Sequence, residues 1–102
     1  MGFYSTVKYK NQLWKYIWFN LDPGLKESVK DDLMNQIVDM YHDGDDIRHV
    51  DNKEYCARII KKDRTNLGMF AGNRFDAEFE TDKINKSRLS ILLLDVIDPM
   101  SN

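Results

Sequence analysis

The chain has 102 residues, of which 42% are hydrophobic and 31% charged, and its formal net charge is −2. This length fits one domain spanning residues 1–102 with its own core, and the patterned apolar runs exclude a disordered chain. A pI of about 5.6 is atypical of nucleic-acid-binding domains, which tend to be basic.

Two apolar stretches at the start of the chain predict strands. Residues 3–9 alternate along the sequence as a strand does. Residues 13–21 are rich in aromatic and β-branched side chains, which favours a second strand, although a short helix capped by Asn11 fits as well. As a strand, this stretch would align Trp14, Tyr16 and Trp18 on one face. We expect these aromatic rings in the core rather than in an interface.

A helix is predicted over residues 23–42. Asp22 can cap this helix, and Pro23 suits its first position, where no amide hydrogen is needed. Apolar side chains recur every four residues along it, at Leu25, Val29, Leu33, Ile37 and Tyr41. Gly44 ends the helix, because glycine readily adopts the left-handed conformation of a helix end. The pattern indicates an amphipathic helix with one face turned toward a sheet.

Further strands are expected after the helix, over residues 54–62, 67–71 and 74–81, with Gly72-Asn73 as a hairpin turn. Residues 88–97 form an apolar run typical of either a central strand or a buried helix. The predicted fold class is therefore α+β. It has one long amphipathic helix packed on a mainly antiparallel sheet, with a buried C-terminal strand or helix.

The charges are segregated, and residues 22–54 carry ten acids and four bases. The aspartates predicted to bind a partner are Asp31, Asp32, Asp39, Asp43, Asp45, Asp46 and Asp51. Such an acidic ridge would steer the chain toward a basic protein, such as a nuclease or another nucleic-acid enzyme. We therefore expect a small intracellular binding protein rather than an enzyme. Its role would be that of an inhibitor or regulator, in the style of phage-encoded inhibitors and immunity proteins.

Bases and aromatic residues are interleaved between residues 58 and 75. Single-stranded nucleic acid is bound by this combination, because bases contact phosphates while aromatic rings stack on nucleobases. The candidate residues for this alternative function are Arg58, Lys61, Lys62, Arg64, Phe70 and Arg74. The simpler interpretation is a charged hairpin whose bases pair with the acidic helix.

Both histidines, His42 and His49, lie among four aspartates between residues 41 and 51. Imidazole and carboxylate groups bind zinc, manganese or iron, so a small metal-dependent hydrolase or ribonuclease is a second alternative. Because Gly44 would interrupt a helix between the two histidines, a solvated turn is the simpler interpretation. We predict no metal site, no cofactor and no catalytic residue.

Cys56 is the only cysteine, so no disulfide can form within the chain, which favours a cytoplasmic location. No stretch approaches the roughly 20 apolar residues that cross a bilayer, and we expect no membrane partner. The sequence does not predict an oligomeric state.

Overall fold

The computed structural model describes residues 4–19, 25–66, 68, 70–81 and 85–99 of the chain. Its elements in chain order are β1 (Ser5–Tyr9), β2 (Gln12–Phe19), α1 (Glu27–Asp43), β3 (Ile47–Asp51), β4 (Tyr55–Thr65), β5 (Gly72–Thr81) and β6 (Asn85–Pro99). These strands form one sheet in the order β1-β2-β6-β5-β4-β3. All neighbouring pairs are antiparallel. The predicted α+β class with an antiparallel sheet is confirmed.

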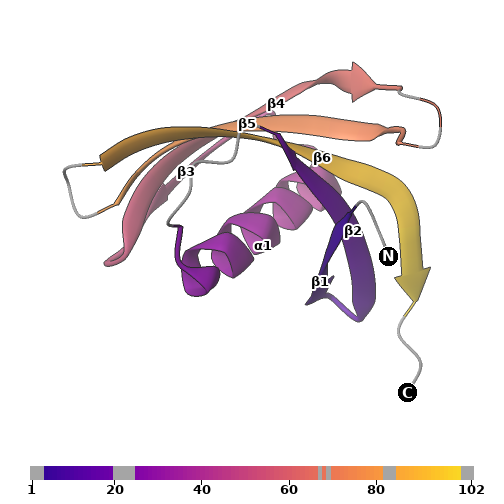
Figure 1. The fold of residues 1–102 in the computed structure, drawn as a ribbon, viewed down its shortest axis with the longest axis horizontal. Coiled ribbons are helices and arrows are strands. Elements are labelled where there is room, and N and C mark those ends of the chain that lie inside the picture. The colour runs from indigo at the N-terminus through magenta and orange to yellow at the C-terminus, as the bar shows by residue number, and fades with distance from the viewer. Residues whose placement is uncertain (1–3, 20–24, 67, 69, 82–84, 100–102) are drawn as a thin grey trace.

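The sheet is curved, and α1 lies along the inner side of the curve (Figure 1). Alternate residues of the strands point toward the helix and are buried with its apolar side chains. The largest fully buried side chains include Trp14, Leu33, Met34, Ile37, Ile59, Phe75, Leu89 and Ile91. Within the part of the chain that the structure describes, no helix is long and apolar enough to span a membrane.

The first hairpin places Trp14 and Tyr16 in the core as expected, and Trp18 is partly buried against that core. Its turn consists of Lys10 and Asn11, which have φ angles of 53° and 59° and so match the twist of the two strands. Trp14 is 1% exposed, and its Nε1 donates a hydrogen bond of 2.8 Å to the carbonyl oxygen of Tyr9. Residues 12–19 are a strand, so the short helix is ruled out for this stretch.

The helix begins later than its sequence pattern predicts. It starts at Glu27, after an extended Lys26 that offers no side-chain cap, while the expected cap Asp22 and Pro23 lie outside the described residues. Its predicted end is confirmed, because Gly44 has a φ of 76° and donates its N–H to the carbonyl oxygen of Met40.

The structure differs from the prediction in two places between the helix and β5. Residues 47–51 form β3, a strand that was not among the predicted elements. Phe70 and Ala71, expected in a strand, lie in the connection between β4 and β5, whereas Gly72 and Asn73 begin β5 instead of forming a turn. Gly72 is needed for a different reason, because a Cβ there would lie 2.1 Å from the backbone oxygen of Leu93 on β6.

The apolar run near the end of the chain is a strand. Residues 88–97 belong to β6, which lies between β2 and β5 inside the sheet. Leu89 to Leu94 are buried, including Leu92 and Leu94, which point away from α1. The alternative of a buried helix is therefore ruled out here.

Candidate functional site

Three of the predicted partner-binding aspartates surround Arg48 of β3. Its Nη2 lies 2.7 Å from the carboxylate of Asp45 and 3.2 Å from that of Asp43. Its Nη1 lies 3.7 Å from the carboxylate of Asp39. The Arg48 side chain is 20% exposed, so this guanidinium compensates the three carboxylates from a largely covered position.

Asp39 also ties the two edges of the sheet to the helix. Lys10, in the β1–β2 turn, lies 2.8 Å from its carboxylate, and the hydroxyl of Tyr9 donates a hydrogen bond of 3.0 Å to it. Since Arg48 belongs to β3 at the other edge, one helix carboxylate contacts both edge strands. Burial alone would raise the pKa of Asp39, but hydrogen bonds from Lys10 and Tyr9 outweigh it and lower that pKa.

Two further aspartates bind groups on β4. The hydroxyl of Tyr55 donates a short hydrogen bond to Asp32, and the Sγ of Cys56 lies 3.3 Å from the carboxylate of Asp51. Burial, together with the nearby carboxylate, raises the pKa of Tyr55.

Replacing Tyr55 by phenylalanine is expected to lower the free energy of unfolding by about 1 kcal/mol. The ring would still fill its buried site, while one hydrogen bond to a carboxylate would be lost. Urea unfolding followed by circular dichroism measures the free energy of unfolding of the native chain and the variant. An unchanged free energy of unfolding would show that the contact with Asp32 does not stabilise the fold.

The acidic segment is therefore largely engaged within the chain. Among the described residues, Asp31 and Asp46 make no side-chain hydrogen bond or ion pair, whereas the other five predicted aspartates do. The segment does not present a continuous row of unpaired carboxylates to a partner.

The basic and aromatic candidates do not form one strip. Arg58 and Arg74 point away from α1, whereas Lys61 lies opposite Phe75 on the helix side. The guanidinium of Arg74 lies 3.1 Å from Asp76. Lys62 and Arg64 line a hollow together with Arg74, but Arg64 is ion-paired with Asp95. Phe70 is half-buried in the connection before β5.

The two histidines lie on different elements. His42 ends α1 with its ring centroid 5.3 Å from that of Trp14, whereas His49 lies on β3 opposite Arg58, on the face away from the helix. Within the described ranges, no group of three or more His, Cys, Asp or Glu side chains is placed to hold a metal ion.

The face of the sheet turned away from α1 is called the open face here, because no described helix packs on it (Figure 1). Directly paired residues of neighbouring strands point to the same side, so the register arranges this face in rows. Across β3, β4, β5 and β6, the first charged row is His49, Arg58, Glu78 and Arg88, and the second is Asp51, Cys56, Glu80 and Lys86.

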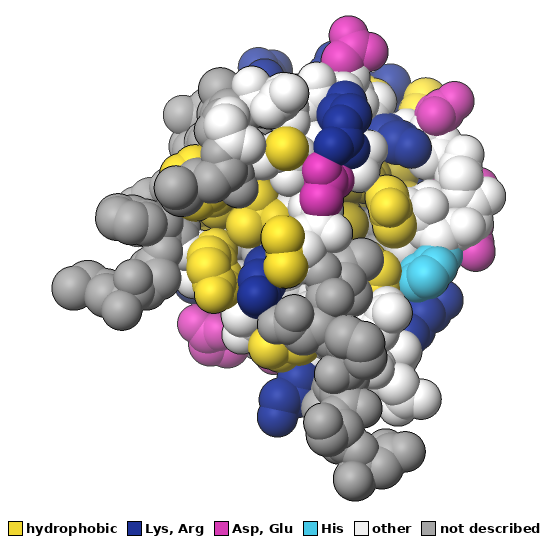
Figure 2. Space-filling model, turned by 90° about the vertical axis from the view of Figure 1, so that its right-hand side faces the viewer, with side chains coloured by type: hydrophobic (Ala, Val, Ile, Leu, Met, Phe, Trp, Pro, Cys, Tyr) yellow, Lys and Arg dark blue, Asp and Glu magenta, His cyan; other side chains and the backbone are white. Residues whose placement is uncertain are grey.

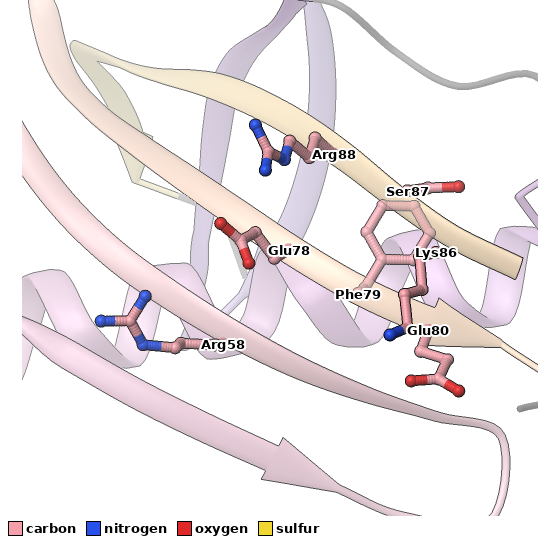
Figure 3. A pocket seen from close by; sticks show the side chains of 7 residues that line it. All are labelled: Arg58, Glu78, Phe79, Glu80, Lys86, Ser87 and Arg88. Atoms are coloured by element: carbon pink, nitrogen blue, oxygen red, sulfur yellow. The ribbon is translucent and has the colours of Figure 1, made fainter.

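A shallow cavity of about 350 Å³ lies over these rows and is lined by Arg58, Glu78, Phe79, Glu80, Lys86, Ser87 and Arg88. Figure 3 shows Arg58, Glu78 and Arg88 on three successive strands. Opposite charges that face each other across strands commonly pair. Among the described residues, however, no ion pair or hydrogen bond joins Glu78 to Arg58 or Arg88, or Glu80 to Lys86.

Apolar side chains accompany the charges elsewhere on the surface. Ile47 and Val96 are 49% and 54% exposed, and Ile47 lies opposite Ile60 on the open face. Figure 2 faces the end of the molecule where β6 bends, and it shows hydrophobic side chains next to basic and acidic ones. Charged and apolar side chains are therefore neighbours at this end of the molecule, as they are in many protein interfaces.

Comparison with protein-family models, curated proteins and solved structures finds no match to this chain. A function has to rest on the geometry of its own residues.

Proposed function

We propose that this protein is a small binding protein that acts by contact with another protein through the open face of its sheet. The observation that carries the proposal is the pair of charged rows on β3 to β6. Arg58, Glu78 and Arg88 alternate in sign without pairing to one another. A partner with the opposite pattern would gain orientation and specificity from such a surface.

The mixture of signs favours a protein over nucleic acid as the partner. Phosphates would be attracted by Arg58, Arg88 and Lys86 but repelled by Glu78 and Glu80, which lie in the same rows. A protein surface can supply both carboxylates and bases at the matching positions.

Among the described residues, few aromatic side chains on this face are exposed for stacking. Tyr4 lies against Lys15, with 5.3 Å between the ring centroid and Nζ, and its exposed fraction is 42%. Phe75 and Phe79 point into the core on the helix side. Because binding of single strands draws on stacked aromatic rings, this arrangement gives nucleic-acid binding little support.

The acidic helix contributes less to the proposed contact than its charge predicts. Asp39, Asp43 and Asp45 form ion pairs with Arg48 or Lys10, so part of their charge is compensated within the chain. Among the described aspartates predicted to bind a partner, Asp31 and Asp46 make no side-chain hydrogen bond or ion pair and could meet a basic partner.

Reversing one charge on the open face is expected to weaken partner binding at least tenfold. Arg88→Glu would place a carboxylate beside Glu78, and a like charge in an interface costs several kcal/mol. The measurement is affinity capture from a lysate of the source cells, with the recovered protein quantified by mass spectrometry.

The matched control is Lys26→Glu, which changes the net charge equally at an exposed position before α1. We expect this variant to recover the same protein as the native chain. Equal recovery by both variants and the native chain would exclude the open face as the contact surface.

A further inference from the structure

We propose that the open face binds the same face of a second copy of this chain in a two-fold symmetric dimer. This inference rests on the proposed function, because it names the partner that the open face fits. The charge pattern of the two rows is complementary to itself in one orientation.

A two-fold dimer brings the same patch of both copies together, so residue i meets residue j twice. When two sheets pack face to face, their strands lie nearly aligned and about 10 Å apart. An axis that runs parallel to the strands, between β4 and β5, places β4 over the partner's β5. The same axis places β3 over the partner's β6 and leaves each residue in its own row.

In this orientation the charged side chains meet opposite charges. Arg58 lies over the partner's Glu78, and Asp51 lies over the partner's Lys86. Each contact occurs twice by symmetry, which gives four ion pairs between the copies. These four side chains make no ion pair with each other within one chain. Asp51 accepts a hydrogen bond from the thiol of Cys56, which leaves its negative charge to interact with the second copy.

The other residues of the two rows fit without a clash of charge. Cys56 would lie over the partner's Glu80, and the imidazole ring of His49 over the partner's Arg88. The cavity beside Glu78 gives space for the long side chain of the partner's Arg58. The guanidinium could enter this hollow without displacing the backbone of either sheet.

The alternative axis, perpendicular to the strands, is disfavoured by the same register. Centred on the first row, it would put Arg58 over the partner's Arg58 and Glu78 over the partner's Glu78. Centred between the rows, it would put Glu78 over the partner's Glu80. Like charges in an interface are strongly unfavourable, so the pattern selects the axis parallel to the strands.

A charge exchange between two variants tests this pairing. Sedimentation velocity of the native chain at about 0.1 M salt, where charges are screened over ~10 Å, is expected to show a dimer. With Arg58→Glu alone, glutamate would meet glutamate in both symmetric contacts between positions 58 and 78. With Glu78→Arg alone, arginine would meet arginine in both. Each single variant is therefore expected to be monomeric, with at least a tenfold weaker association.

An equimolar mixture of Arg58→Glu and Glu78→Arg is expected to form a dimer again, because position 58 of one chain then meets an opposite charge at position 78 of the other in both contacts. The variant Arg58→Glu/Glu78→Arg is expected to dimerise by itself. Circular dichroism of each variant checks that it is folded, and the doubly exchanged chain also restores the opposite charges across β4 and β5.

A monomeric native chain would overturn the dimer. So would single variants that still dimerise, or a mixture that stays monomeric. If the native chain is monomeric while Arg88→Glu still abolishes capture of another protein, the dimer alone is wrong. If neither association nor capture responds to changes on the open face, the proposed function is wrong as well.

Discussion

Replacing Gly72 by alanine is expected to lower the free energy of unfolding by about 3 kcal/mol, at the upper end of the usual range for overpacking. The added Cβ would lie 2.1 Å from the oxygen and 2.8 Å from the carbonyl carbon of Leu93. Both are backbone atoms of β6, which is fixed between β2 and β5, so no side chain can move aside. The two strands would have to separate locally. Urea unfolding followed by circular dichroism measures the loss.

Gly68→Ala is the matched control for this prediction. A Cβ at Gly68 meets nothing within 4 Å, but the φ of 67° is unfavourable for alanine and costs roughly 1–2 kcal/mol. The free energy of unfolding should therefore fall more in Gly72→Ala than in Gly68→Ala. Equal losses would mean that β5 and β6 adjust to the Cβ without separating.

Asp39→Ala is expected to lower the free energy of unfolding by about 2 kcal/mol near neutral pH. The substitution leaves the hydroxyl of Tyr9 without its acceptor and removes one of the three carboxylates around Arg48. Losing one partner of such a cluster leaves the remaining groups incompletely paired. The contact of both edge strands with the helix would weaken together.

The effect of Asp39→Ala depends on pH in a defined direction. The pKa of Asp39 is lower in the folded chain than its usual value, which is about 3.9 in an unfolded chain. The stabilisation of the fold by the Asp39 carboxylate is therefore complete above the unfolded pKa. It disappears as the pH falls through the folded pKa. The difference in the free energy of unfolding between the native chain and Asp39→Ala should shrink below about pH 4.

Asp31→Ala serves as the control, because Asp31 is exposed and makes no side-chain hydrogen bond or ion pair with another described residue. Its effect on unfolding should stay within about 0.5 kcal/mol. A similar loss for both aspartates, or a loss for Asp39→Ala that persists at acidic pH, would show that Asp39 does not tie the sheet edges to the helix.

The parts of the fold with a clear local period could be predicted from the sequence. Val29, Leu33 and Ile37 recur at helical spacing and are buried. Phe75, Ala77 and Phe79 alternate with acids and face the core. In both cases a single segment contains the whole signal, because one buried face determines the spacing of apolar residues along it.

The turn predicted at Gly72 is wrong because glycine has two uses. It permits turns, and it also permits close approach of two backbones. The choice between these uses depends on Leu93, which is 21 positions away and pairs with the neighbouring residue Asn73. No local pattern contains that information.

The candidate site was harder to predict for a related reason. The row of Arg58, Glu78 and Arg88 exists only through strand register, and a shift of one residue would turn Glu78 toward the core. Likewise, the contacts of Asp39 with Lys10 and Arg48 join three separate elements, so they depend on the tertiary fold. Charge counts along the sequence could not show which acids are paired.

The open face is the surface through which we propose that this chain contacts a protein. Cys56 is exposed on that face, in the row that contains Glu80 and Lys86, and it is the only cysteine. Its rate of alkylation by a small reagent therefore reports directly on coverage of the open face. We predict that this rate falls as the native chain is concentrated and recovers in about 1 M salt, where screening acts over ~3 Å. A rate that is independent of concentration, salt and added cell extract would contradict the claim.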